Sequence, residues 1–229
     1  MPRSLSRAGL SSRTSHTAVE RELLVQALRP EARVLEAGCG RTTRLAEYRD
    51  RITELVGVDL DASACEANRA LDTAVVADLC HPLPFPNGSF DLIYSNFVIE
   101  HLDAPAAAFA EWRRLLSSGG ALILLTSNRA SPALAISAVI PRRARLALKR
   151  AGAGVAEEDV IATRYRANTP WRLDTLLVKA SFEPVDVEHV ATLHRYAERA
   201  PRLATVLRAL ERRFPAKLRS TIVAWYRAV

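Results

Sequence analysis

Short apolar runs alternate along the chain with segments of helical character. Buried strands of a parallel sheet are short and almost continuously apolar, whereas the helices that cover such a sheet mix apolar and polar positions. We therefore expect an α/β fold with a mostly parallel sheet and helices on both faces. The expected strands cover residues 34–36, 55–59, 73–77, 90–96, 121–126, 185–190 and 221–227. The expected helices cover residues 18–29, 42–50, 62–71 and 171–181, with basic helices between the last two strands.

Two helices carry recognisable start signals. Thr17 and Glu20 have the spacing of a capping box at the start of the helix at 18–29. Asp103 is expected to cap a further helix, which ends at Gly119–Gly120.

The alternation pauses between residues 129 and 170, after the fifth expected strand. A loop of that length inside a compact domain is usually a lid or a substrate-binding element. Because no internal repeat or second core is evident, we expect a single domain over residues 1–229, with an inserted segment at 129–170. Residues 1–16 place arginines among serines without an apolar stretch, which favours a flexible tail over a secretory signal.

The composition is that of an ordinary globular protein, with 49% hydrophobic and 25% charged residues. Charged residues interrupt the apolar runs before any reaches the length of a membrane span, so no transmembrane segment is expected. Cys39, Cys65 and Cys80 are isolated in the sequence. They indicate reduced thiols rather than disulfides or a zinc site, so we expect no metal and a cytoplasmic location.

The net charge of +7 is concentrated in basic clusters at 142–150 and 195–219. Such clusters occur on solvated helices, but they also attract phosphates, nucleic acid or anionic lipid. The stretch 132–149 mixes apolar and basic residues, which fits either an amphipathic lid or a surface that contacts a membrane or a lipid-like acceptor. The pattern does not predict an oligomeric state.

The most informative motif is the turn Gly38–Cys39–Gly40, which follows the first expected strand. Glycine allows a sharp turn and lets a ligand approach where a Cβ would clash. Asp59 stands at the end of the second strand and Asp78 at the end of the third. These positions meet at the carboxyl edge of an open sheet, where a carboxylate can accept hydrogen bonds from ribose hydroxyls and another from an adenine amino group.

The turn departs from a dinucleotide-binding fingerprint, which has a third glycine that packs its helix against the sheet. No glycine occurs near position 43, and Arg44 stands there instead. Glu36, two residues before the glycines, would repel a pyrophosphate but suits a cation such as the α-ammonium group of a methionine moiety.

These residues resemble the class I S-adenosylmethionine methyltransferases, in particular the type 11 group that includes quinone-biosynthesis enzymes. The resemblance covers roughly residues 30–128. Its motifs are VLEAGCG at 34–40, GVDLD at 57–61, ADL at 77–79, LPFPNGSFDLI at 83–93, EHL at 100–102 and GGALIL at 119–124. Thr42 and Ser118 depart from it, because the family often has glycine and proline at those positions.

The resemblance implies a Rossmann-like sheet of seven strands with a reversed final strand, and S-adenosylmethionine as the cofactor. Glu36 and the glycine turn would line the methionine part, Asp59 would bind the ribose, and Leu60 would flank the adenine. The implied cofactor-binding residues are Glu36, Gly38, Cys39, Gly40, Asp59, Leu60, Asp78, Leu79 and Asn96.

We predict methyl transfer to a small-molecule acceptor that is lipid-like or anionic. A general base is needed only where the acceptor must lose a proton, and His101 is the candidate, although its motif could also be a helix start that simply packs. Tyr165 and Arg166 are candidates for binding the acceptor, with Arg166 holding an anionic group.

Three alternatives remain. An RNA or DNA methyltransferase would suit the positive charge, but it is disfavoured by the sequence SNFV at 95–98 and by an aromatic content of 6%. A cofactor-binding partner subunit without activity would keep the acidic positions. An NAD-dependent dehydrogenase is disfavoured by Glu36 and the missing third glycine.

Overall fold

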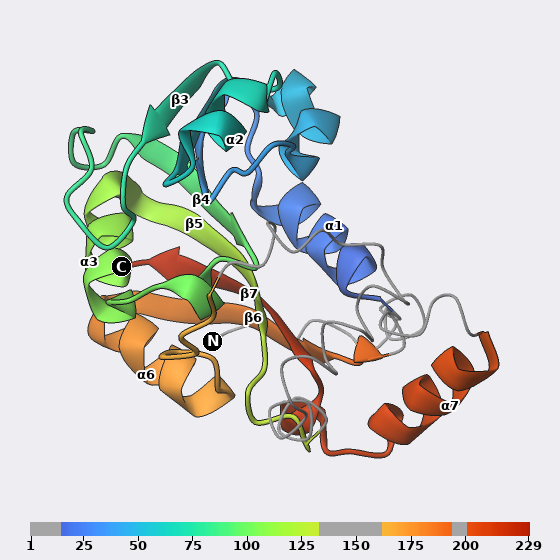
Figure 1. Ribbon diagram of the computed structural model, residues 1–229. Helices are drawn as coiled ribbons and strands as arrows, with labels where there is room; N and C mark the ends of the chain where they lie inside the picture. The colour runs from blue at the N-terminus through green and yellow to red at the C-terminus, as the bar shows by residue number, and fades with distance from the viewer. Residues whose placement is uncertain (1–14, 133–161, 194–200) are drawn as a thin grey trace.

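The computed structural model describes residues 15–132, 162–193 and 201–229 of the chain. They form a seven-stranded sheet with the strand order β3-β2-β1-β4-β5-β7-β6 (Figure 1). Six strands run in the same direction, and β7 is reversed, pairing antiparallel with both β5 and β6. The predicted Rossmann-like fold and the reversed final strand are therefore confirmed.

The elements follow one another as the alternation predicted. The strands are β1 (Ala32–Ala37), β2 (Ile52–Asp59), β3 (Thr73–Val76), β4 (Phe90–Asn96), β5 (Leu116–Ser127), β6 (Phe182–Val190) and β7 (Thr221–Ala228). The helices are α1 (His16–Ala27), α2 (Ala62–Ala67), α3 (Pro105–Leu115), α6 (Pro170–Lys179) and α7 (Pro201–Arg212), with short 3-10 helices η2 (Arg44–Arg51), η3 (Ile99–His101) and η6 (Ala216–Leu218).

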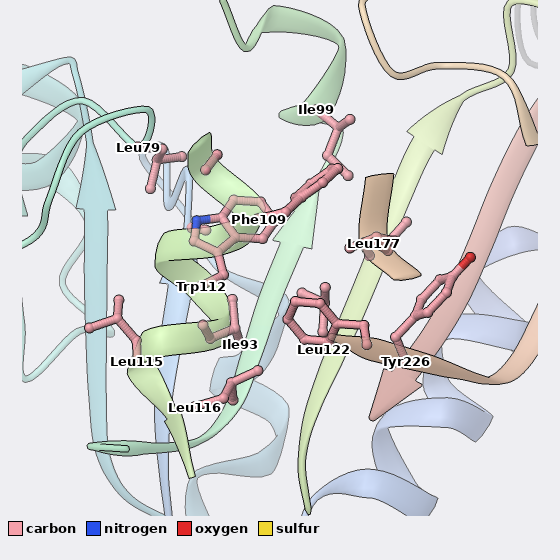
Figure 2. Packing of buried hydrophobic residues seen from close by; sticks show 14 of the residues in the cluster. Leu79, Ile93, Ile99, Phe109, Trp112, Leu115, Leu116, Leu122, Leu177 and Tyr226 are labelled. Carbon is pink, nitrogen blue, oxygen red and sulfur yellow. The ribbon is translucent and has the colours of Figure 1, made fainter. Parts of the chain in front are cut away.

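Each face of the sheet packs against its own helices, because successive residues of a strand point to opposite faces. Leu35 of β1 lies in the cluster formed with α3 and α6, whose centre is Trp112 (Figure 2). Val34 lies in the second cluster, which α1 completes with Leu23 and Leu24. Helix α1 therefore lies on the opposite face of the sheet from α3 and α6 (Figure 1).

Both expected helix caps are wrong. Helix α1 begins two residues earlier than expected, with Ser15 as the N-cap whose hydroxyl accepts a hydrogen bond from the amide of Ala18. Helix α3 has Ala104 as its N-cap, without a side-chain hydrogen bond. The carboxylate of Asp103 instead forms an ion pair with Arg164, 3.0 Å away.

Helix boundaries also differ from the prediction. Helix α3 ends at Leu115 and the chain enters β5 at once, so the glycines expected to end the helix lie inside a strand. Residues 44–51 form a 3-10 helix, and α2 stops at Ala67 because the side chain of Asn68 bonds to the glycine turn.

The predicted insertion lies between β5 and β6, as expected. Its central part, residues 133–161, lies outside the described residues, as do most of the predicted tail (residues 1–14) and residues 194–200 of the second basic cluster. In the described part of the chain, no helix is long and apolar enough to cross a membrane.

Candidate functional site

The glycine turn is fixed by hydrogen bonds to the end of β2. The amides of Gly38 and Cys39 both donate to the carbonyl oxygen of Val58, at 2.7 and 3.2 Å. Gly38 and Gly40 have φ values of +79° and +52°, in the region that favours glycine. The turn is therefore held rigidly at the carboxyl edge of the sheet.

The two glycines have different surroundings. A Cβ on Gly38 would lie 2.2 Å from a methyl group of Val98, so packing alone excludes a side chain there. A Cβ on Gly40 would meet nothing within 4 Å. The space beside Gly40 is thus open to a ligand.

Asp59 lies beside this space, as predicted. One oxygen of its carboxylate accepts a hydrogen bond from the amide of Gly40 at 2.9 Å, and the other accepts from the amide of Asp61 at 3.0 Å. Carboxylate oxygens can each accept more than one hydrogen bond, so Asp59 can also accept bonds from a ribose. The side chain of Leu60 is 70% exposed next to it, where a flat apolar base could pack.

Asn68 is a site residue that the sequence did not reveal. It is buried, and its side-chain amide donates to the carbonyl oxygens of Cys39 and Gly40, at 3.1 and 3.2 Å. These two bonds hold the outer side of the turn. Nothing in the sequence links Asn68 to a turn so far from it along the chain.

Glu36 is buried with an exposed fraction of 3%, and its Oε2 has no hydrogen-bond partner among the described residues. Burial raises the pKa of Glu36 to about 8, although a hydrogen bond with Thr43 opposes the shift. The negative charges of Asp59 and Glu20 add to the increase in the pKa. An ionised carboxylate in such a place is stable only when it is paired with a cation.

Asn96 ends β4, the strand next to β1. Its Oδ1 is also buried without a hydrogen-bond partner in the described part of the chain. Two unpaired acceptors on neighbouring strand ends therefore accompany an open glycine turn and the carboxylate of Asp59. The two unpaired acceptors suit the ammonium group of S-adenosylmethionine, and the carboxylate of Asp59 suits its ribose. The open space at Gly40 would let the ligand approach the main chain of the protein.

The remaining predicted cofactor residues have structural contacts of their own. The carboxylate of Asp78 accepts from the amide of Cys80 at 2.8 Å and lies 3.0 Å from the ring nitrogen of His81. The bond from Cys80 is the main reason that the pKa of Asp78 is lowered. The side chains of Leu79 and Cys39 are buried in the protein, so their contacts with a cofactor would come mainly from the backbone.

Glu100 connects the end of the sheet to the chain that follows the insertion. It is buried, and its carboxylate accepts hydrogen bonds from the hydroxyls of Thr126 and Ser127 at 2.8 and 2.9 Å. Its backbone carbonyl accepts from the amides of Arg164 and Tyr165 at 2.7 and 3.0 Å. Glu100, which was not among the predicted site residues, thus fixes the segment that carries the acceptor candidates.

His101 lies in η3, three residues after Val98, which packs against Gly38. Its Nδ1 is 2.9 Å from the carbonyl oxygen of Ala162. A carbonyl only accepts, so Nδ1 carries the proton and Nε2 of the neutral ring keeps its lone pair. His101 thus lies three residues from the valine that packs against Gly38, and the hydrogen bond to Ala162 fixes the orientation of its ring.

Tyr165 and Arg166 lie on the same returning segment. Arg166 is mostly exposed, and its guanidinium is 3.6 Å from Asp103, which also binds Arg164. The ring of Tyr165 is half-buried under the guanidinium of Arg129, 5.2 Å from the ring centre. A loosely paired arginine and an aromatic ring thus border the segment that touches His101.

The fold and the sequence motifs at this edge of the sheet are similar to those of known methyltransferase domains. A family model described as "Methyltransferase domain" matches residues 35–124. This segment contains the glycine turn, β2 with Asp59, and the strand end at Asn96. The resemblance noted in the sequence is therefore confirmed for residues 35–124, which are less than half of the chain.

Two relatives show how far the likeness extends. A malonyl-[acyl-carrier protein] O-methyltransferase of Enterobacter lignolyticus is 38% identical over 98 residues, which are 42% of this chain and 39% of that protein. A ubiquinone biosynthesis O-methyltransferase of Xanthomonas campestris is 33% identical over 121 residues, 48% of this chain and 49% of that protein. The chain thus aligns with less than half the length of either relative.

A solved structure extends the likeness of the fold to nearly the whole chain. The S-adenosylmethionine dependent methyltransferase from Mesorhizobium loti superposes with a TM-score of 0.63 at 20% identity, covering 93% of this chain and 98% of that one. At this identity, the likeness concerns the fold alone.

Replacing each glycine of the turn by alanine distinguishes a glycine required for packing from a glycine required for ligand binding. Both changes strain a positive φ, at a cost of about 1–2 kcal/mol. Gly38→Ala also forces a methyl group against Val98, so it should lower the free energy of unfolding clearly more than Gly40→Ala. Gly40→Ala should remain folded but lose affinity for S-adenosylhomocysteine in calorimetry, and unchanged affinity would show that the open space is not part of the site.

Glu36→Gln should stabilise the ligand-free protein in a pH-dependent way. Below pH 4.5, the pKa of Glu36 in the unfolded chain, its carboxyl group is protonated in both the folded and the unfolded state. Its ionisation then takes nothing from the free energy of unfolding. As the pH rises to about 8, only the unfolded state releases the proton, and wild-type stability falls. Urea denaturation should therefore show the variant more stable by a few kcal/mol above about pH 8 and little different near pH 4. A difference independent of pH would contradict the burial of an unpaired carboxylate.

Proposed function

We propose that the protein transfers a methyl group from S-adenosylmethionine to a small-molecule acceptor. One observation supports this most directly: a buried carboxylate without a cation, Glu36, adjoins an open glycine turn that Asp59 borders. When bound, the cofactor would supply a methyl group on its sulfonium sulfur, for in-line transfer to an acceptor atom with cleavage of the carbon–sulfur bond and release of S-adenosylhomocysteine.

The residues of the chain position the reactants and keep water away from them, which is the main requirement of methyl transfer. Glu36 and Asn96 would hold the α-ammonium group and Asp59 the ribose. Leu60 would pack against the adenine, with Asp78 and Leu79 beside it.

His101 would remove a proton from an acceptor hydroxyl, amine or acidic carbon. Its Nδ1 is held by the carbonyl of Ala162, so the ring is oriented and Nε2 is available as the base. The adjoining segment would line the acceptor, with Tyr165 against its apolar part and Arg166 against an anionic group. The relatives are named as a malonyl-[acyl-carrier protein] O-methyltransferase and a ubiquinone biosynthesis O-methyltransferase, which supports an anionic or lipid-like acceptor.

Asp59→Ala is the direct test of the cofactor site. Loss of charge-assisted hydrogen bonds to the ribose, each roughly 1.5–3 kcal/mol, should weaken S-adenosylhomocysteine binding about 10- to 100-fold in calorimetry. Asp61→Ala is the matched control, since this exposed carboxylate only caps α2 and should leave the affinity unchanged. Equal affinities of Asp59→Ala and wild type would contradict the assignment.

A thermal-shift comparison identifies the ligand class. A ligand that binds only the folded state raises the melting temperature of the protein. S-adenosylhomocysteine should therefore raise the melting temperature of the wild type, whereas NAD, which is not expected to bind, should leave it unchanged. Stabilisation by NAD alone would favour the dehydrogenase alternative.

His101→Asn should separate catalysis from binding. A general base accelerates a reaction about 10²–10⁴-fold. With an acceptor found in a panel of phenols, carboxylic acids and amines, the variant should therefore release S-adenosylhomocysteine at least about 10²-fold more slowly than the wild type. Affinity for S-adenosylhomocysteine should stay unchanged. Equal turnover would show that His101 is not the base, and methylation of RNA in place of the panel would favour the nucleic-acid alternative.

A further inference from the structure

Helix α1 brings a second buried carboxylate to the cofactor site. Glu20, on the first half of α1, has an exposed fraction of 2%. Its Oε1 accepts a hydrogen bond from the hydroxyl of Tyr94. Tyr94 is the register partner of Glu36 on the neighbouring strand, so the side chains of Tyr94 and Glu36 lie next to each other on the face that α1 covers. Glu20 and Glu36 thus approach the same place from a helix and from a strand.

The negative charge at this place is poorly compensated. Burial is the main cause of a raised pKa for Glu20, and Glu20 in turn helps to raise the pKa of Glu36. Glu47 of η2 and Asp59 of β2 add further negative charge to the surroundings. The hydrogen bond from Tyr94 favours the ionised form of Glu20.

Arg44 forms an ion pair with Glu20. Its guanidinium lies 3.6 Å from Glu20 Oε2, and its side chain is 45% exposed. An ion pair at this distance with a partly solvated arginine is weak. Glu20 Oε2 has no hydrogen-bond partner among the described residues, and neither has Glu36 Oε2. The two carboxylates therefore lack the donors that a buried ionised pair requires.

Glu20 also lies at the wall of a cavity. It lines a cavity of about 380 Å³ between α1 and η2, together with Thr17, Arg44 and Tyr48. An ammonium group carries three donors on a compact positive charge, which matches two carboxylate oxygens that lack hydrogen-bond partners among the described residues.

We propose that Glu20 is a second binding residue for the α-ammonium group of the cofactor, which it shares with Glu36, so that α1 is part of the cofactor site. This inference rests on the proposed function. Glu20 precedes the matched segment 35–124, so its role is not transferred from the family. Tyr94 is then a positioning residue, because its hydroxyl fixes the carboxylate of Glu20.

Two ligands separate this role from a purely structural one. S-adenosylhomocysteine carries the amino-acid moiety, whereas 5′-methylthioadenosine has the same nucleoside without it. Calorimetry on Glu20→Gln should show binding of S-adenosylhomocysteine weakened about tenfold, as expected for one lost charge-assisted bond, and binding of methylthioadenosine unchanged. Glu47→Gln is the matched control, since it removes a negative charge from the same cavity at an exposed, salt-bridged position and should affect neither ligand.

The outcomes are distinct. Selective loss of S-adenosylhomocysteine supports the inference. Equal loss of both ligands in Glu20→Gln would assign Glu20 a structural role, and unchanged binding of both would remove it from the site; either result overturns the inference while the proposed function stands. A wild-type protein that binds neither ligand would overturn the proposed function and this inference with it.

Discussion

Burial of the Glu36 carboxylate is the constraint on which the interpretation of this site depends. A carboxylate taken out of water must be protonated or paired with a cation, and the described surroundings provide hydrogen bonding from Thr43 and the negative charges of Asp59 and Glu20. A buried carboxylate that destabilises the ligand-free protein can be compensated when a ligand supplies the cation that it lacks. The buried carboxylate thus supports our proposal that this site binds a cationic ligand.

The fold determines why this charge meets the rest of the site. The strand order places β1 between β2 and β4, so the chain leaves the sheet in opposite directions on its two sides, and ligands bind at that switch point. Asp59 and Asn96 end β2 and β4, and Glu36 is the residue before the last in β1. Val98, just beyond β4, packs on Gly38 and so connects the cofactor turn to His101. The residues proposed to bind the cofactor and the proposed base His101 thus lie at one edge of the sheet.

The sequence predicted those features that depend on nearby residues. The strands, the glycine turn and Asp59 follow from local patterns together with the rule that parallel strands end at one edge. Asn68, Glu100 and Glu20 were missed because their partners lie far away in the sequence, at Gly40, Thr126 and Tyr94. The caps failed for a related reason: the tertiary ion pair between Asp103 and Arg164 engages a carboxylate that local spacing assigned to a helix end.

A crystal structure of the protein with S-adenosylhomocysteine tests the central claim most directly. The account predicts the α-ammonium group within hydrogen-bond distance of Glu36 and the ribose hydroxyls on Asp59, with the ligand backbone passing Gly40. A ligand bound elsewhere, or bound at this edge with Glu36 still lacking any partner, would contradict it.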